Sequence, residues 1–440
     1  MSVLLLVLGL LAYCLGDPRI FDIAEPKDAD LRPSYTGNAT ANPLAELLTW
    51  LRNRDFTEEQ SYLRGTNTYG SALEWRAEDA EKVLAHYSEE LDRWDALMAT
   101  DRTTWRVPHV GDEGWMFDRL VSAVILDGWR IRVALEHSKF DDARRWSREL
   151  TQFGWGVTRA QGGQDIQALA MNGQMTGMLQ ELHTLHRSNA SPAELLTVLR
   201  QWSEEEPRRE DVQFSQQVAY TADLQMMSEV LRDRSAMHSW SMCMGEPDWW
   251  PSSFDRVFIW EFKPHRTQGE FLDYRRRLHA ALGKNWSAVG AIVEHERDEF
   301  STEAFYRGLR QANFGGHYFY VSWRVHSDVT AEGFFRRVAL HRIARLELAM
   351  RIFELNHGKL PPSLAEVYAE VPEAAALRDP YTDEREPLRW SSGNGQLYAL
   401  GPDGRDDGGR TNGMRNIGLR YEWRPDDPPP KLAPRQPKGR

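Results

Sequence analysis

The stretch "RRVALHRIARLELAMRIFELNHGKLPPSLAEVYAEV", residues 336–371, contains a long amphipathic helix and the point at which that helix stops. Its apolar residues return every three or four positions, which predicts a helix with one buried face. Asn356-His357-Gly358 and the Pro361-Pro362 pair then break the pattern. Glycine and proline at such positions are typical of a helix end. Upstream of this point the helical pattern repeats, and downstream it changes.

Successive amphipathic segments fill the middle of the chain, from about Gly114 to Ser235. Short polar breaks separate them, so neighbouring helices are expected to run antiparallel. Ser191-Pro192-Ala193-Glu194 is a typical helix start, with a Ser cap, Pro at the first position and an acid in the first turn. No clean repeat of 34 residues follows, so the pattern favours an irregular helical array over a tetratricopeptide repeat.

Helical spacing also covers residues 43–99, where Asn42 is a candidate cap for the first helix. Two segments interrupt the pattern. Residues 241–265 combine Gly, Pro and three Trp, which predicts a long loop or an insertion of short helices. Residues 313–325, "NFGGHYFYVSWRV", carry Gly-Gly and an aromatic, β-rich run, which predicts an extended bridge.

Composition limits the classes of function. The chain has 440 residues, of which 41% are hydrophobic and 27% charged, as in ordinary folded proteins. Its formal net charge of −11 argues against a nucleic-acid partner, which would require a basic surface. The 17 tryptophans are spread along the chain, so they are expected mainly in cores and interfaces.

The N-terminus, "MSVLLLVLGLLAYCLGDPRI", is apolar from Val3 to Leu15. This run is shorter than the roughly 20 residues that cross a bilayer as a helix, and it fits the apolar region of a secretory signal. We therefore expect a signal peptide at residues 1–16 and export to the periplasm, the cell envelope or the medium. The N-terminal segment would associate with the membrane if it stayed uncleaved or were lipidated at Cys14. After cleavage Cys243 is the one remaining cysteine, so no intramolecular disulfide is expected.

The C-terminal part carries a specific resemblance. The helix that ends at Asn356-His357-Gly358 is followed by "LRDPYTDEREPLRW" and "GQLYALGPDGRDDGG". This order resembles the C-terminal domain of type II secretion major pseudopilins over about 90 residues, roughly 330–420. The resemblance implies a helix packed on a small α+β domain. Two features depart from the family: a helical domain precedes the module in place of the apolar assembly helix, and "DEREP" is longer than the usual turn. The whole chain resembles uncharacterised envelope proteins of planctomycete-type bacteria, which implies an architecture and no activity.

The loop "GPDGRDDGG" follows an apolar run. The pseudopilin resemblance implies calcium binding, with Asp403 and the Leu400 carbonyl as matched ligands and Asp406 and Asp407 as further carboxylates in a looser alignment. Calcium takes six to eight oxygen ligands, which such a loop could supply. The alternative is a plain solvated turn, because Asp-Gly pairs adopt positive φ at little cost. Both interpretations stay open at the level of sequence.

These observations predict a mainly α protein, in which an irregular antiparallel helical array precedes a small α+β pseudopilin-like domain. The expected divisions are the signal at 1–16, an N-terminal helical segment at 17–105, the array at 106–328, the pseudopilin-like domain at 329–423 and a disordered Pro-rich tail at 424–440. The chain has no Gly-x-Ser-x-Gly, Walker or Gly-x-Gly-x-x-Gly motif. We therefore expect a non-enzymatic exported scaffold or binding protein with a protein partner in the envelope. The alternative is an exported hydrolase of glycans or peptides, with its site in the Trp-rich residues 241–265.

Overall fold

The computed structural model describes residues 24–34, 42–52, 77–107, 113–232, 263–299, 313–392, 395–409 and 417–420. The longer helices are α2 (Pro43–Arg52), α4 (Ala77–His86), α5 (Ser88–Met98), α6 (Glu113–Glu136), α7 (Phe140–Thr158), α8 (Gln164–Arg187), α9 (Pro192–Glu204), α10 (Arg209–Arg232), α13 (Pro264–Leu282), α14 (Trp286–Glu299), α16 (Phe314–His357) and α17 (Leu364–Glu370). The described chain is mainly α, and the array of consecutive helices is confirmed.

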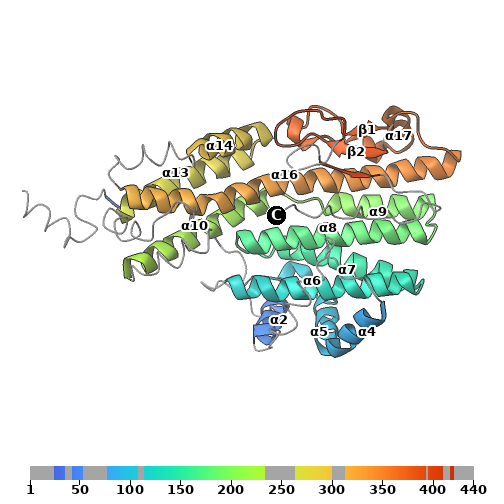
Figure 1. Cartoon of the computed structure of the whole chain (residues 1–440), viewed down its shortest axis with the longest axis horizontal. Coiled ribbons are helices and arrows are strands. Elements are labelled where there is room, and N and C mark those ends of the chain that lie inside the picture. The colour runs from blue at the N-terminus through green and yellow to red at the C-terminus, as the bar shows by residue number, and fades with distance from the viewer. Residues whose placement is uncertain are drawn as a thin grey trace, which may run out of the picture.

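Most of these helices lie along one long axis (Figure 1). Helices α6, α7 and α8 form one side, and α2, α4 and α5 cover its outer face at an angle. Helix α16 runs along nearly the whole length of the molecule, with α8, α9 and α10 on one side of it and α13, α14 and the C-terminal sheet on the other.

Glycines allow α7 and α8 to pack backbone against backbone. A Cβ atom at Gly154 of α7 would lie 2.4 Å from the backbone oxygen of Ala170 and from the backbone nitrogen of Gln174. A Cβ atom at Gly177 of α8 would lie 2.4 Å from the backbone nitrogen of Thr151. Because no side chain fits at these distances, the two glycines set how closely the two antiparallel helices approach.

The buried side chains form two hydrophobic clusters. One extends from α2 to the first part of α8, and the other includes the second part of α8, α9, α10, α13, α14, α16 and the C-terminal sheet. Helix α8 belongs to both, so it joins the two halves of the molecule. The second cluster runs from the array into the C-terminal module without a break.

The extended bridge predicted for residues 313–325 is wrong. Asn313 precedes α16, and the helix continues from Phe314 to His357 over 44 residues. The aromatic run favours a strand locally, but Tyr320 is buried on the helix between Phe271 and Tyr274, with ring centroids 5.3 and 6.0 Å away. Burial of this aromatic surface outweighs the local preference for extended backbone.

Predicted helix starts are confirmed in detail. The Ser191 side chain accepts from the Glu194 backbone N–H, and the Glu194 side chain accepts from the Ser191 backbone N–H, which forms a complete capping box. Asn42 caps α2 by accepting from the Ala45 N–H, and its side chain also binds the backbone of Arg106. The Asn42 cap therefore also ties α2 to the segment that follows α5.

The C-terminal module consists of the later part of α16, from about residue 329, and the elements that follow it. Gly358 has φ +66°, a left-handed conformation that glycine adopts without strain. Helix α17, the short helix α18 (Pro372–Ala375) and the 3-10 turn η3 (Pro380–Thr382) lead to strands β1 (Arg389–Ser391), β2 (Gln396–Ala399) and β3 (Ile417–Arg420). The strands form an antiparallel sheet in the order β1-β2-β3, in which Leu397 pairs with Trp390 and Leu419. Strands β2 and β3 pack on α16.

Candidate functional site

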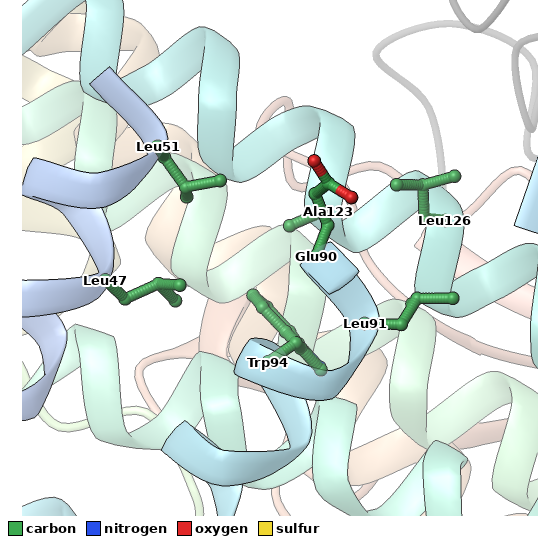
Figure 2. A pocket seen from close by; sticks show the side chains of 7 residues that line it. All are labelled: Leu47, Leu51, Glu90, Leu91, Trp94, Ala123 and Leu126. Carbon is green, nitrogen blue, oxygen red and sulfur yellow. The ribbon is translucent and has the colours of Figure 1, made fainter. Parts of the chain in front are cut away.

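An apolar groove lies where α2, α5 and α6 meet (Figure 2). Leu47 and Leu51 of α2 face Leu91 and Trp94 of α5, and Ala123 and Leu126 of α6 complete the lining. Glu90 is its single charged residue. The open space is only about 10 Å³, so this site is a shallow apolar groove between packed helices.

A larger and more polar cleft, of about 460 Å³, lies between the array and the C-terminal module. We call it the seam cleft. It is lined by residues from the end of α9, from the α9–α10 connection, from α16 and from the segment after α18: Ser203, Glu204, Glu206, Pro207, Arg208, Arg342, Arg345, Ala376 and Leu377.

Glu206 is the centre of the ion pairs in the seam cleft. One of its carboxylate oxygens accepts from Nε and Nη2 of Arg342 at 3.0 and 2.6 Å, and the other accepts from Arg345 at 2.9 Å. Arg345 also donates to the Ser203 hydroxyl at 2.9 Å. Because Arg342 and Arg345 are three residues apart on α16, both reach the same carboxylate from one helix face.

Burial affects the charges at this site in two ways. Burial acts to raise the pKa of Glu206, but the Arg342 guanidinium and its neighbours outweigh it and lower that pKa below its usual value. His341 lies behind the cleft with no solvent exposure, and burial lowers its pKa to about 3. Neither ring nitrogen of His341 has a hydrogen-bond partner among the residues that the structure describes. Glu206 is therefore ionised and His341 neutral at pH 7.

The turn "DEREP" makes further polar contacts that hold the module in place. Asp383 accepts from the Ser287 backbone N–H at 3.0 Å and from its hydroxyl at 2.7 Å. Glu384 accepts from Arg209 at 3.0 Å and from Arg342 at 3.3 Å. This turn therefore contributes to holding the module on the helices.

A second group of charges is buried between α7, α8 and the end of α9. Arg148 of α7 forms a two-pronged pair with Glu205, with distances of 2.9 and 2.6 Å. Glu181 of α8 accepts from the Trp202 indole at 3.0 Å, and burial raises its pKa to about 7. The carboxylates of this group face an arginine or an indole N–H and lie inside the packed helices, so they have no open space for a substrate.

A third group lies between α5, α6 and α7. Asp127 is fully buried and pairs with Arg130, which also contacts Asp95 at 2.7 Å and Glu149 at 3.5 Å. The Arg130 guanidinium lies 4.7 Å from the centre of the Trp146 ring. Burial raises the pKa of Asp127 to about 7, and its second oxygen has no hydrogen-bond partner within the described chain.

The loop predicted to bind calcium is described from Leu400 to Gly409. Asp403 accepts from the Arg405 N–H at 3.1 Å, and Asp406 accepts from the Gly408 N–H at 2.9 Å, as in solvated turns. The Leu400 N–H donates to Asp379 at 2.8 Å, and Asp407 is half-buried. In the parts of the chain that the structure describes, no three His, Cys, Asp or Glu residues are grouped to hold a metal ion. Calcium binding by this loop stays a prediction.

Most of the Trp-rich insertion, predicted at 241–265, lies outside the described residues, since the description resumes at residue 263. The hydrolase alternative stays untested for that reason. The predicted signal at 1–16 and the tail at 424–440 also lie outside. Among the helices that the structure describes, none is long and apolar enough to cross a membrane.

Comparisons with known proteins give no relative: no family model, no curated protein and no solved structure matches this chain.

Sequence reasoning missed the residues of the seam cleft. Arg342 and Arg345 carry a weak signal, because they lie on the face of a long helix that is otherwise apolar. Their partner Glu206 is 136 residues before Arg342 in the chain, and no local pattern links them. Pairing across such a separation is set by how the helices pack.

Proposed function

We propose that the chain is an exported, non-enzymatic binding protein of the cell envelope, with a pseudopilin-like module fixed to the end of a helical array. One observation carries the proposal. A long helix, α16, ends at a left-handed glycine and packs along an antiparallel sheet that follows an Asp-Pro turn. This is the order of elements that the pseudopilin resemblance implies, and pseudopilins act by assembling with other proteins.

The contacts between the array and the module favour a scaffold over a protein in which the module moves independently of the array. Their buried side chains belong to one cluster, and Glu206, Asp383 and Glu384 add polar contacts across the boundary. The seam cleft stays open at this boundary, and its mixed arginines and glutamates suit a polar segment of a protein partner.

The test is site-specific photo-crosslinking in cells that produce the full chain. A photoreactive residue replaces Glu204, which is exposed at the seam cleft, or Glu78, which is exposed on α4 far from it. We expect a protein adduct in the envelope fraction with Glu204 replaced and none with Glu78 replaced. Equal labelling at the two positions, or recovery of the chain from the cytosol alone, would contradict the proposal.

A further inference from the structure

The C-terminal module contains a buried carboxylate that links three of its segments. Asp379 has no solvent exposure, and it lies directly before the turn η3. One of its oxygens accepts from the Tyr381 N–H at 2.9 Å, and the other accepts from the Leu400 N–H at 2.8 Å. Asp379 therefore ties the turn to the end of β2, where the predicted calcium loop begins.

Three carboxylates meet at one guanidinium in this module. Arg389 of β1 contacts Asp379 through Nη1 at 2.7 Å, Glu386 through Nη2, and Asp406 through Nε at 3.4 Å. The other oxygen of Asp406 accepts from the Tyr398 hydroxyl at 3.1 Å. The Arg389 side chain is only 18% exposed, so its charge lies among these groups.

Three carboxylates close together repel one another unless a cation lies between them. A calcium ion could serve, but it needs six to eight oxygens around one point. The flat guanidinium with its five N–H donors serves the same electrostatic purpose, and each of its three nitrogens faces a different carboxylate here. The carboxylates of this cluster thus fit an internal arginine better than a bound metal ion.

We infer that Arg389 is the built-in cation of the C-terminal module and braces the loop at residues 400–409 without a metal ion. Removal of Arg389 leaves Asp379, Glu386 and Asp406 without their common partner, and within the described chain these carboxylates are not grouped to hold a metal ion in its place. The inference does not depend on the protein partner, and it is opposed to the calcium site that the pseudopilin resemblance implies.

The experiment compares melting temperatures of the full chain in millimolar calcium and in EDTA. The variants are Arg389→Ala, which removes the common partner of the three carboxylates, and Arg385→Ala, which removes the same charge from a side chain that is 79% exposed and 3.9 Å from Asp383. We expect equal melting temperatures with and without calcium for the wild type and for Arg385→Ala. Arg389→Ala is expected to melt several degrees lower than Arg385→Ala in both conditions.

Two results would overturn the inference: a calcium-dependent rise in the melting temperature of the wild type, or a melting temperature of Arg389→Ala equal to that of Arg385→Ala. If Arg389→Ala does not fold, Arg389→Lys replaces it, because lysine keeps the charge but lacks the three separate nitrogens that face the carboxylates. A melting temperature of Arg389→Lys below that of Arg385→Ala supports the inference, and an equal one overturns it.

Discussion

At the scale of single residues, the unusual feature is the number of titratable groups buried in the helical array. Asp127 and Glu181 are buried carboxyls, and burial raises the pKa of each to about 7. His341 is a buried imidazole, and burial lowers its pKa to about 3. The two kinds of group give stability opposite dependences on pH.

Asp127→Asn tests the buried carboxyl. In the unfolded chain this group titrates near its ordinary value of about 4, so the folded state holds an extra proton between about pH 4 and pH 7. As the pH falls from about 8 to about 5, the free energy of unfolding of the wild type should therefore rise relative to Asp127→Asn, by at most about 1.4 kcal/mol per pH unit. Denaturant melts at several pH values measure this, with the exposed Asp141→Asn as control. A difference that does not vary with pH would count against a protonated Asp127.

His341→Leu tests the buried imidazole. An unfolded histidine gains a proton as the pH falls below about 6.5, whereas the folded chain keeps His341 neutral down to about pH 3. The wild type therefore loses stability at this site over that interval, and the leucine variant does not. We expect the variant to gain stability relative to the wild type between about pH 7 and about pH 4, at most about 1.4 kcal/mol per pH unit. The same denaturant melts measure it, and a constant difference would show that His341 is accessible to protons.

At the scale of elements, the approach of α7 and α8 depends on glycine. Both Gly154 and Gly177 face the backbone of the other helix at a distance that excludes a methyl group. Gly173 of α8 differs, because the nearest atom to an added Cβ there is 3.7 Å away, an ordinary contact. The three positions form a matched set for one substitution.

Gly154→Ala and Gly177→Ala are each expected to lower the free energy of unfolding by about 3 kcal/mol or more, since the helices must move apart. Gly173→Ala should be neutral or stabilise by up to about 1 kcal/mol, because alanine favours helix more than glycine does. Thermal and denaturant melts of the three variants make the comparison. A similar loss at all three positions would argue against the close packing of α7 on α8.

Individual helices also show which structural features a local sequence pattern can predict. The capping box at Ser191 and Glu194 is local, and its residues predict it in full. The helix over residues 314–325 is not local in origin, because its aromatic side chains favour a strand until Phe271 and Tyr274 pack against Tyr320. Local chemistry predicted the first, and only tertiary packing decided the second.

At the scale of the whole molecule, the boundary between array and module combines one continuous core with two kinds of ion pair. Glu206 faces two arginines of α16, with its side chain 24% exposed. The Arg200–Glu373 pair crosses the same boundary at 2.7 Å, but its arginine is 62% exposed. The two pairs differ in burial, which decides how much each contributes.

Glu206→Gln should destabilise the protein by about 3 kcal/mol, since it leaves two arginines without their shared carboxylate in a largely buried place. Glu373→Gln should cost less than about 1 kcal/mol, as is usual for an exposed pair. Denaturant melts of the full chain give both values. Equal and small effects would mean that the apolar core alone holds the module to the array.

The sequence by itself determined the mainly α class, most helix positions, the helix start at Ser191 and the end of the long helix at Gly358, because periodicity and capping depend on residues a few positions apart. Only the tertiary structure decided that Arg342 and Arg345 meet Glu206, that Arg389 gathers three carboxylates, and that two glycines set the distance between α7 and α8. Most of these contacts join residues far apart in the chain or on separate elements. Their geometry depends on how whole helices pack, which no local pattern of residues specifies.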